Sequence, residues 1–97
     1  MRTVEEWWTG LDAARHTVEE TLSAAGRDPA SIPRYLSLDS SPQFSLASLG
    51  VFEEMVDRAE GLGFTDVITH WPRPDGPYAG SVAVLEEVAA WLPTRAD

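Results

Sequence analysis

Residues 34–71, RYLSLDSSPQFSLASLGVFEEMVDRAEGLGFTDVITHW, contain the pattern that decides the fold. In residues 34–39 the leucines alternate with polar side chains, which predicts a short β-strand. Residues 65–71 are rich in β-branched side chains and predict a second strand. An amphipathic helix, expected from about Ser48 to Leu62, separates the two strands. Because a helical crossover joins them, we expect the strands to run parallel, with a right-handed connection.

A longer amphipathic helix is predicted in front of this unit, over Thr3–Ala25. Thr3 followed by Glu6 is a capping-box pattern, and Gly26 is suited to the left-handed backbone that ends a helix. The apolar positions of this helix share one face: Val4, Trp7, Trp8, Leu11, Ala14, Val18, Leu22 and Ala25. The two tryptophans are candidates either for the core or for a partner surface.

Two further segments complete the expected order of elements. Asp28 and Pro29 predict a short helical turn before the first strand. Residues 72–77, PRPDGP, predict a loop after the second strand. Ser81 is then expected to cap a third helix, which Pro93 closes. The predicted order is helix–strand–helix–strand–helix, an α/β architecture over a single domain of residues 1–97.

Composition and charge exclude several classes of function. The chain has 97 residues, no cysteine, seven arginines without lysine, and a net charge of −9. Disulfides, thiolate metal sites and cysteine nucleophiles are therefore excluded. The acidic balance lacks the basic footprint of nucleic-acid binding and the polybasic patch of a membrane-surface protein. No apolar run has the length of a membrane span, and the acidic start does not resemble a signal peptide. We expect a cytoplasmic protein.

The predicted sheet is too small to be complete in one chain. Two parallel strands are marginal, and parallel sheets are normally covered on both faces. We therefore expect completion by homo-oligomerisation or by a separately encoded larger chain. In a self-associating, non-catalytic module, four chains would supply the eight strands of a barrel, and apolar strand residues would pack between protomers: Leu36, Leu38, Val67 and Ile68. The alternation leaves open whether Val67, Thr69 and Trp71 face inward, or Ile68 and His70.

Four stretches, taken in order and spacing, resemble the C-terminal end of luciferase-like monooxygenases. They are AGRDPASI at residues 25–32, FEEMVDR at 52–58, LGFTDVI at 62–68 and HWPRP at 70–74. Residues 84–90 are similar to the last helix of that family. The resemblance spans essentially the whole chain. It implies a TIM-barrel oxidoreductase of which this chain is the last quarter, beginning at the helix before the seventh strand.

The resemblance also implies a cofactor, a substrate class and a restriction. Members of the family use FMN or a deazaflavin to oxidise a small organic substrate. Most of the family's cofactor contacts lie in the three quarters of the barrel that this chain lacks. We therefore expect the isolated chain to be inactive, as a gene fragment, a split subunit or a truncated paralogue.

Candidate site residues follow the two strands, because active sites of α/β barrels lie at the carboxyl ends of their strands. At the end of the first strand lie Asp39, as a hydrogen-bond acceptor, and Ser40 and Ser41, as phosphate donors. At the end of the second strand lie three further candidates. His70 is the candidate catalytic residue, as a general base or a group that polarises a flavin carbonyl. Trp71 is suited to stack on a cofactor ring, and Arg73 to bind a phosphate or carboxylate.

Each of these candidates also has a structural interpretation. Asp39 and the serines are also suited to capping their own turn, His70 and Trp71 to packing, and Arg73 to a surface ion pair. The remaining motifs point to no chemistry. The acidic pairs on the helices are solvated faces, and Gly61-Leu62-Gly63 follows a helix where a dinucleotide fingerprint would precede one. No second histidine is spaced for a metal site, so no metal is expected.

Overall fold

The computed structural model describes residues 2–95 and contains the predicted order of elements. Its helices are α1 (Val4–Ala24), α2 (Leu49–Gly61) and α3 (Val82–Arg95), and its strands are β1 (Tyr35–Ser37) and β2 (Asp66–Ile68). The two strands form a parallel sheet with Leu36 opposite Val67. Short 3-10 turns cover Pro29–Ser31, Leu38–Ser40 and Ser45–Ala47. The α/β class and the parallel pairing are therefore confirmed.

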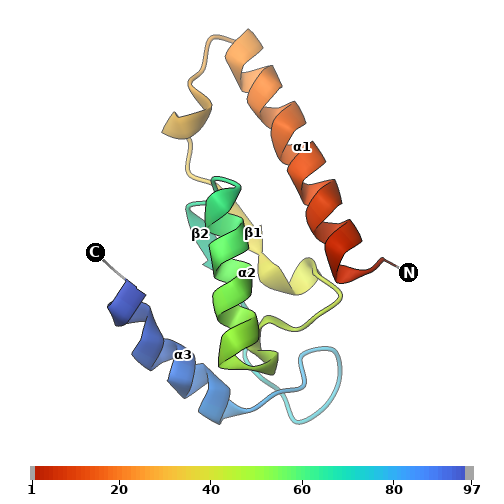
Figure 1. Ribbon diagram of the computed structural model, residues 1–97, viewed down its shortest axis with the longest axis vertical. Coiled ribbons are helices and arrows are strands. Elements are labelled where there is room, and N and C mark those ends of the chain that lie inside the picture. Colours follow the sequence, from red (N-terminus) through yellow and green to blue (C-terminus); the bar gives the residue numbers. More distant parts are fainter. Residues whose placement is uncertain (1, 96–97) are drawn as a thin grey trace.

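The helices and the sheet form two layers, with α2 lying across one face of the sheet (Figure 1). Leu36 is buried and Val67 packs against the core beneath this helix layer. Their strand neighbours point the other way, so Tyr35 is 64% exposed and Ile68 is 48% exposed. The alternation that the sequence left open is thereby settled: Val67 faces the helix layer and Ile68 faces away from it. The two layers make a slab with extents of 46 × 37 × 17 Å.

Both strands are shorter than predicted, because backbone groups at their ends bond to side chains instead of to a neighbouring strand. The chain turns into a 3-10 helix at Leu38, where the sequence predicted strand as far as Asp39. The second strand ends at Ile68 instead of Trp71, since the His70 backbone N–H donates to the Asp39 carboxylate. The strand ends are thus shaped by Asp39.

The helix boundaries follow their capping residues. Thr3 and Glu6 form the predicted capping box, with bonds of 2.9 and 3.0 Å. Gly26 has the left-handed φ of 80° that a terminating glycine permits. Ser48 accepts a bond from the backbone at the start of α2. One boundary prediction is wrong, because α3 continues through Pro93 to Arg95. Its last turn is held by Arg95, which pairs with two acids of α2, Asp57 and Glu60.

Helix α1 contributes side chains to the buried core through its first half only. Trp7 and Trp8 are buried in an edge-to-face pair with centroids 4.8 Å apart. Arg58 of α2 covers the Trp8 ring and forms two hydrogen bonds with Glu5. Farther along the predicted apolar stripe, Val18 is 52% exposed. The two tryptophans therefore belong to the core, and the second half of α1 extends past the sheet (Figure 1).

One core joins all three helices to the sheet. Its buried apolar members are Trp7, Trp8, Leu36, Leu38, Leu46, Phe52, Met55, Ala59 and Val88. Because Leu36 and Leu38 lie inside this core, the prediction that they pack between protomers is wrong. Among residues 2–95, no helix is both long and apolar enough to cross a membrane.

We expect Leu38→Ala to lower the free energy of unfolding by about 2–5 kcal/mol, because Leu38 is fully buried and its loss leaves a cavity. Val18→Ala removes an exposed apolar side chain and should change the free energy of unfolding by no more than about 0.5 kcal/mol. Urea unfolding followed by tryptophan fluorescence measures both. Equal effects of the two substitutions would contradict this description of the core.

Candidate functional site

Asp39 and His70 meet at the carboxyl ends of the two parallel strands. Asp39 follows β1 and His70 follows β2, and adjacent parallel strands end at the same edge of a sheet. The imidazole Nδ1 lies 2.9 Å from Asp39 Oδ2, and the His70 backbone N–H donates to the same oxygen at 2.8 Å. The structure thus joins two of the residues that the sequence predicted for the site.

The Asp39 carboxylate is the best-satisfied polar group of this region. Its side chain is only 1% exposed. Its Oδ1 accepts from the Ser45 backbone N–H at 2.8 Å, and its Oδ2 also accepts from the Thr69 hydroxyl at 3.3 Å. Burial, the largest influence, raises the pKa of Asp39. The hydrogen bonds from Ser45 and His70 together outweigh it and hold that pKa below its ordinary value.

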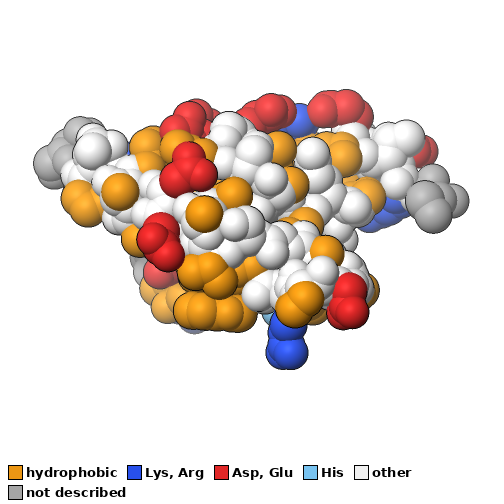
Figure 2. All heavy atoms as spheres, turned by 90° about the horizontal axis from the view of Figure 1, so that it is seen from below, with side chains coloured by type: hydrophobic (Ala, Val, Ile, Leu, Met, Phe, Trp, Pro, Cys, Tyr) orange, Lys and Arg blue, Asp and Glu red, His pale blue; other side chains and the backbone are white. Residues whose placement is uncertain are grey.

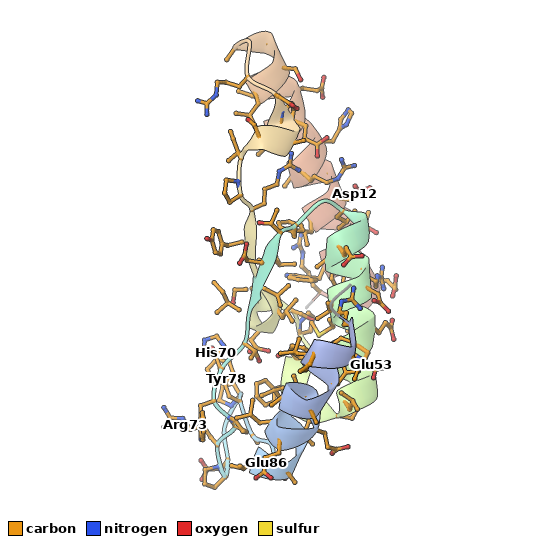
Figure 3. All side chains as sticks on the ribbon, turned by 90° about the vertical axis from the view of Figure 1, so that its left-hand side faces the viewer. Asp12, Glu53, His70, Arg73, Tyr78 and Glu86 are labelled. Carbon is orange, nitrogen blue, oxygen red and sulfur yellow. The ribbon has the colours of Figure 1, made fainter. Side chains whose placement is uncertain are left out.

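The Asp39 carboxylate fixes both the orientation and the tautomer of His70. An ionised carboxylate can only accept hydrogen bonds, so the imidazole proton resides on Nδ1. Nε2 is then unprotonated in the neutral ring, and it has no hydrogen-bond partner within residues 2–95. The His70 side chain is 40% exposed, on the side of the sheet away from the helices (Figure 3). An imidazole held in this way can accept a proton or a hydrogen bond from a bound molecule.

Tyr78 completes the site and was not predicted from the sequence. Its ring stacks on His70 with centroids 4.1 Å apart and planes 7° apart. On another side it contacts Phe44, with centroids 5.8 Å apart. Figure 3 shows Tyr78 beside His70 at the end of the sheet. The stack covers one face of the imidazole and leaves its edge accessible.

The loop that carries Tyr78 is closed by its own backbone. The Arg73 N–H donates to the Tyr78 carbonyl at 2.8 Å, and the Gly80 N–H donates to the Arg73 carbonyl at 2.9 Å. Gly76 turns the loop with a φ of 85°. A Cβ on Gly80 would lie 2.9 Å from the Phe44 ring, so only glycine allows this close approach. In the sequence, the signal that could have indicated this folded-back loop is the group of glycines and prolines around an aromatic residue.

The other predicted site residues play different parts. The Ser40 hydroxyl donates to the Ser37 carbonyl, and the Ser41 hydroxyl accepts from the Gln43 backbone. These hydroxyls stabilise their own turn and are not directed at His70. Trp71 follows His70 in the chain and is 65% exposed, next to the Asp39–His70 pair, which we call the dyad. Arg73 is exposed and lies on the same side of the molecule as His70 (Figure 3).

Three kinds of comparison with known proteins identify no relative of this chain, so the candidate site is defined by its geometry. The chain matches no protein-family model, no curated protein and no solved structure. Within residues 2–95, no group of three or more His, Asp or Glu side chains is arranged to hold a metal ion. The Asp39–His70 pair is therefore the centre of the candidate site.

We expect Asp39→Asn to lower the free energy of unfolding by about 1–3 kcal/mol at pH 7, because the amide NH₂ faces hydrogen-bond donors. The lowered pKa means that the native carboxylate stabilises the fold fully above the ordinary aspartate value of about 3.9. That stabilisation is lost as the pH falls from about 3.9 toward the lower pKa that Asp39 has in the folded protein. The difference between wild type and variant should therefore shrink at acid pH.

Denaturant unfolding at several pH values measures this difference. Asp75→Asn is the matched control, because Asp75 is an exposed carboxylate in the neighbouring loop and its replacement should have little effect. An Asp39→Asn protein as stable as wild type at neutral pH would contradict the hydrogen-bonded arrangement described above.

Proposed function

We propose that this chain provides the last two strands of a luciferase-like barrel, and that its Asp39–His70 pair serves an oxidoreductase site for a small organic substrate. The observation that carries the proposal is the pairing of these two side chains across the carboxyl ends of adjacent parallel strands. In α/β barrels this edge of the sheet is where substrates bind. The choice of an oxidoreductase reaction rests on the stretches that resemble the luciferase-like family.

The proposal gives each residue of the pair a separate role. Asp39 is a positioning residue, since it holds the His70 ring through Nδ1 and stabilises an imidazolium if one forms. His70 Nε2 faces the bound molecule, where it accepts a proton from a substrate hydroxyl or hydrogen-bonds a substrate or cofactor donor. When bound, FMN or a deazaflavin supplies the redox chemistry itself.

The residues around the pair suit one wall of a flavin site. Trp71 presents an exposed ring for stacking, and Tyr78 lines the dyad. Arg73 offers a guanidinium to an anionic group, and its main chain is fixed by the loop. Ser40 and Ser41 are bonded to their own turn and do not join this wall. A single chain thus offers one side of a site, and for this reason we expect that the isolated chain does not turn over substrate.

Titration with FMN and with a deazaflavin, followed by the fluorescence of the cofactor, tests this proposal. We expect saturable binding of one of the two by the purified protein, and a rise of about 10-fold or more in Kd for His70→Gln. That rise corresponds to the loss of one hydrogen bond to a charged or strongly polar group.

His16→Gln is the matched control, because His16 lies on the exposed side of α1 beside Glu20. It should bind the cofactor as the wild type does. Failure of both cofactors to bind, or equal affinities for the His70 and His16 variants, would refute the proposed role of the dyad.

A further inference from the structure

The two hydrogen bonds from His70 to Asp39 restrict one edge of the imidazole. The backbone N–H, at 2.8 Å, and Nδ1, at 2.9 Å, both meet the same oxygen, Asp39 Oδ2. A ring restricted at one atom can still tilt about that contact, because the outer torsion of a histidine side chain has a broad energy well. The lone pair of Nε2 lies in the plane of the ring. The tilt of that plane therefore decides the direction in which His70 accepts a hydrogen bond.

The ring of Tyr78 makes a contact that restricts this tilt. It lies nearly parallel to the imidazole, with 7° between the two planes and 4.1 Å between the centroids. Tilting the imidazole would open one end of the stack and press the other end together, and closely packed rings resist both changes. A hydrogen bond restrains one atom, whereas the stack covers a whole face of His70. The stack thus limits the motion that the bonds to Asp39 leave open.

Tyr78 is itself held from two directions other than His70. Its ring contacts Phe44, which packs against the hydrophobic core. Its backbone carbonyl accepts from the Arg73 N–H at 2.8 Å. Gly80 lies so close to Phe44 that a Cβ on this glycine would stand 2.9 Å from the ring. A continuous series of contacts therefore runs from the core through Phe44 and Tyr78 to His70.

Tyr78 lies outside the hydrophobic core that it leans on. It is half-buried, and it is neither a member of the core cluster nor one of the apolar residues packed against that cluster. Replacing its ring therefore leaves the core intact. The aromatic contacts that such a replacement removes are those with Phe44 and His70. The role of the ring can thus be tested in a folded protein.

The surface around His70 has little net charge. The loop that carries Tyr78 holds one base, Arg73, and one acid, Asp75, and both are exposed. Most of the other acids lie on the helices, and His70 lies on the side of the sheet away from them. Figure 2 shows acidic side chains gathered along one side of the molecule and hydrophobic side chains on the opposite side. Recognition at the imidazole itself therefore rests on the hydrogen bond to Nε2 more than on charge.

We propose that Tyr78 is a positioning residue of the candidate site, which holds the plane of the His70 imidazole so that Nε2 points in one direction before a ligand binds. Because Tyr78 covers one face of the ring, a bound molecule meets His70 at the open edge, with an N–H or O–H donor in the plane of the imidazole. The role of Tyr78 toward a ligand rests on the proposed function. Its hold on the ring rests on the stack alone.

Nuclear magnetic relaxation of the His70 ring, measured on the whole chain without ligand, tests this hold. We expect an order parameter of about 0.85 in the wild type and below about 0.6 in Tyr78→Leu, which lacks a flat ring. Tyr78→Phe keeps the ring and loses only the hydroxyl, so it should retain the wild-type value. The nitrogen shifts of the neutral imidazole should show the proton on Nδ1 in every variant, because the bond to Asp39 does not involve Tyr78.

The chain offers matched controls for these substitutions. Tyr35 is the only other tyrosine and is exposed at the start of β1, so Tyr35→Leu should leave His70 as ordered as in the wild type. Gly80→Ala keeps Tyr78 but crowds Phe44, so it should also loosen the imidazole, and it tests the same hold if Tyr78→Leu loses the fold. Gly61→Ala is its control, because a Cβ there meets no atom within 4 Å. Circular dichroism shows whether each variant keeps its helices.

Three outcomes would overturn the positioning role. One is an imidazole that stays as ordered in Tyr78→Leu as in the wild type. Another is an equal loss of order in Tyr78→Phe, because the hydroxyl and not the ring would then hold His70. The third is a Tyr78→Leu protein in which the Nδ1 proton is also displaced, because Tyr78 would then support the bond to Asp39 instead of the ring plane.

Titration of the same variants with FMN and with a deazaflavin separates this role from the proposed function. For the cofactor that binds, Tyr78→Leu should raise Kd about 2- to 10-fold, since the loosened ring must be ordered on binding, and Tyr78→Phe should not. A wild type that binds neither cofactor, with an imidazole that loses order only in Tyr78→Leu, would refute the proposed function alone. A cofactor bound equally well by the wild type and Tyr78→Leu would refute the positioning role alone.

Discussion

The buried carboxylate of Asp39 is the group on which the centre of this structure depends. The parallel sheet has only three residue pairs, so its backbone ladder is short. Burying an ionised carboxylate is costly unless hydrogen bonds compensate for the lost water. Here the compensation comes from the chain on both sides of the crossover, from Ser45 after β1 and from Thr69 and His70 after β2. The need to satisfy this one group therefore holds the two strand ends together.

The same requirement produces the site. A carboxylate that accepts both from the backbone and from the ring of His70 leaves the imidazole little freedom to rotate. The fixed ring gives Tyr78 a flat surface on which to stack, and Phe44 contacts that tyrosine in turn. Stability and site geometry are thus supplied by the same contacts. A substitution at Asp39 affects both, which is why the proposed function is tested at His70 and not at its partner.

The features of the fold that depend on neighbouring residues could be predicted from the sequence. Caps such as Thr3 and Ser48 act within a few residues, so the helix starts were predictable. That Asp39 and His70 lie at one edge of the sheet followed from one topological rule, that parallel strands end at a common edge, whereas their hydrogen bonds were not predicted. The position of Tyr78 was not predictable, because it depends on backbone hydrogen bonds within its loop that no sequence pattern indicates. The exposure of Val18 was also beyond prediction, because an apolar stripe does not reveal how much of a helix finds a partner.

The uncovered face of the sheet links the fold to the site. A sheet covered on one face turns every second strand residue toward solvent, and the apolar ones among them in β1 and β2 are Tyr35 and Ile68. The imidazole edge is open to water for the same reason that the apolar residues are exposed. A layer that covered the apolar part of this face would also lower the dielectric around the Asp39–His70 pair and strengthen its electrostatic interactions. The exposure of the apolar residues and the exposure of the imidazole edge therefore have one structural cause.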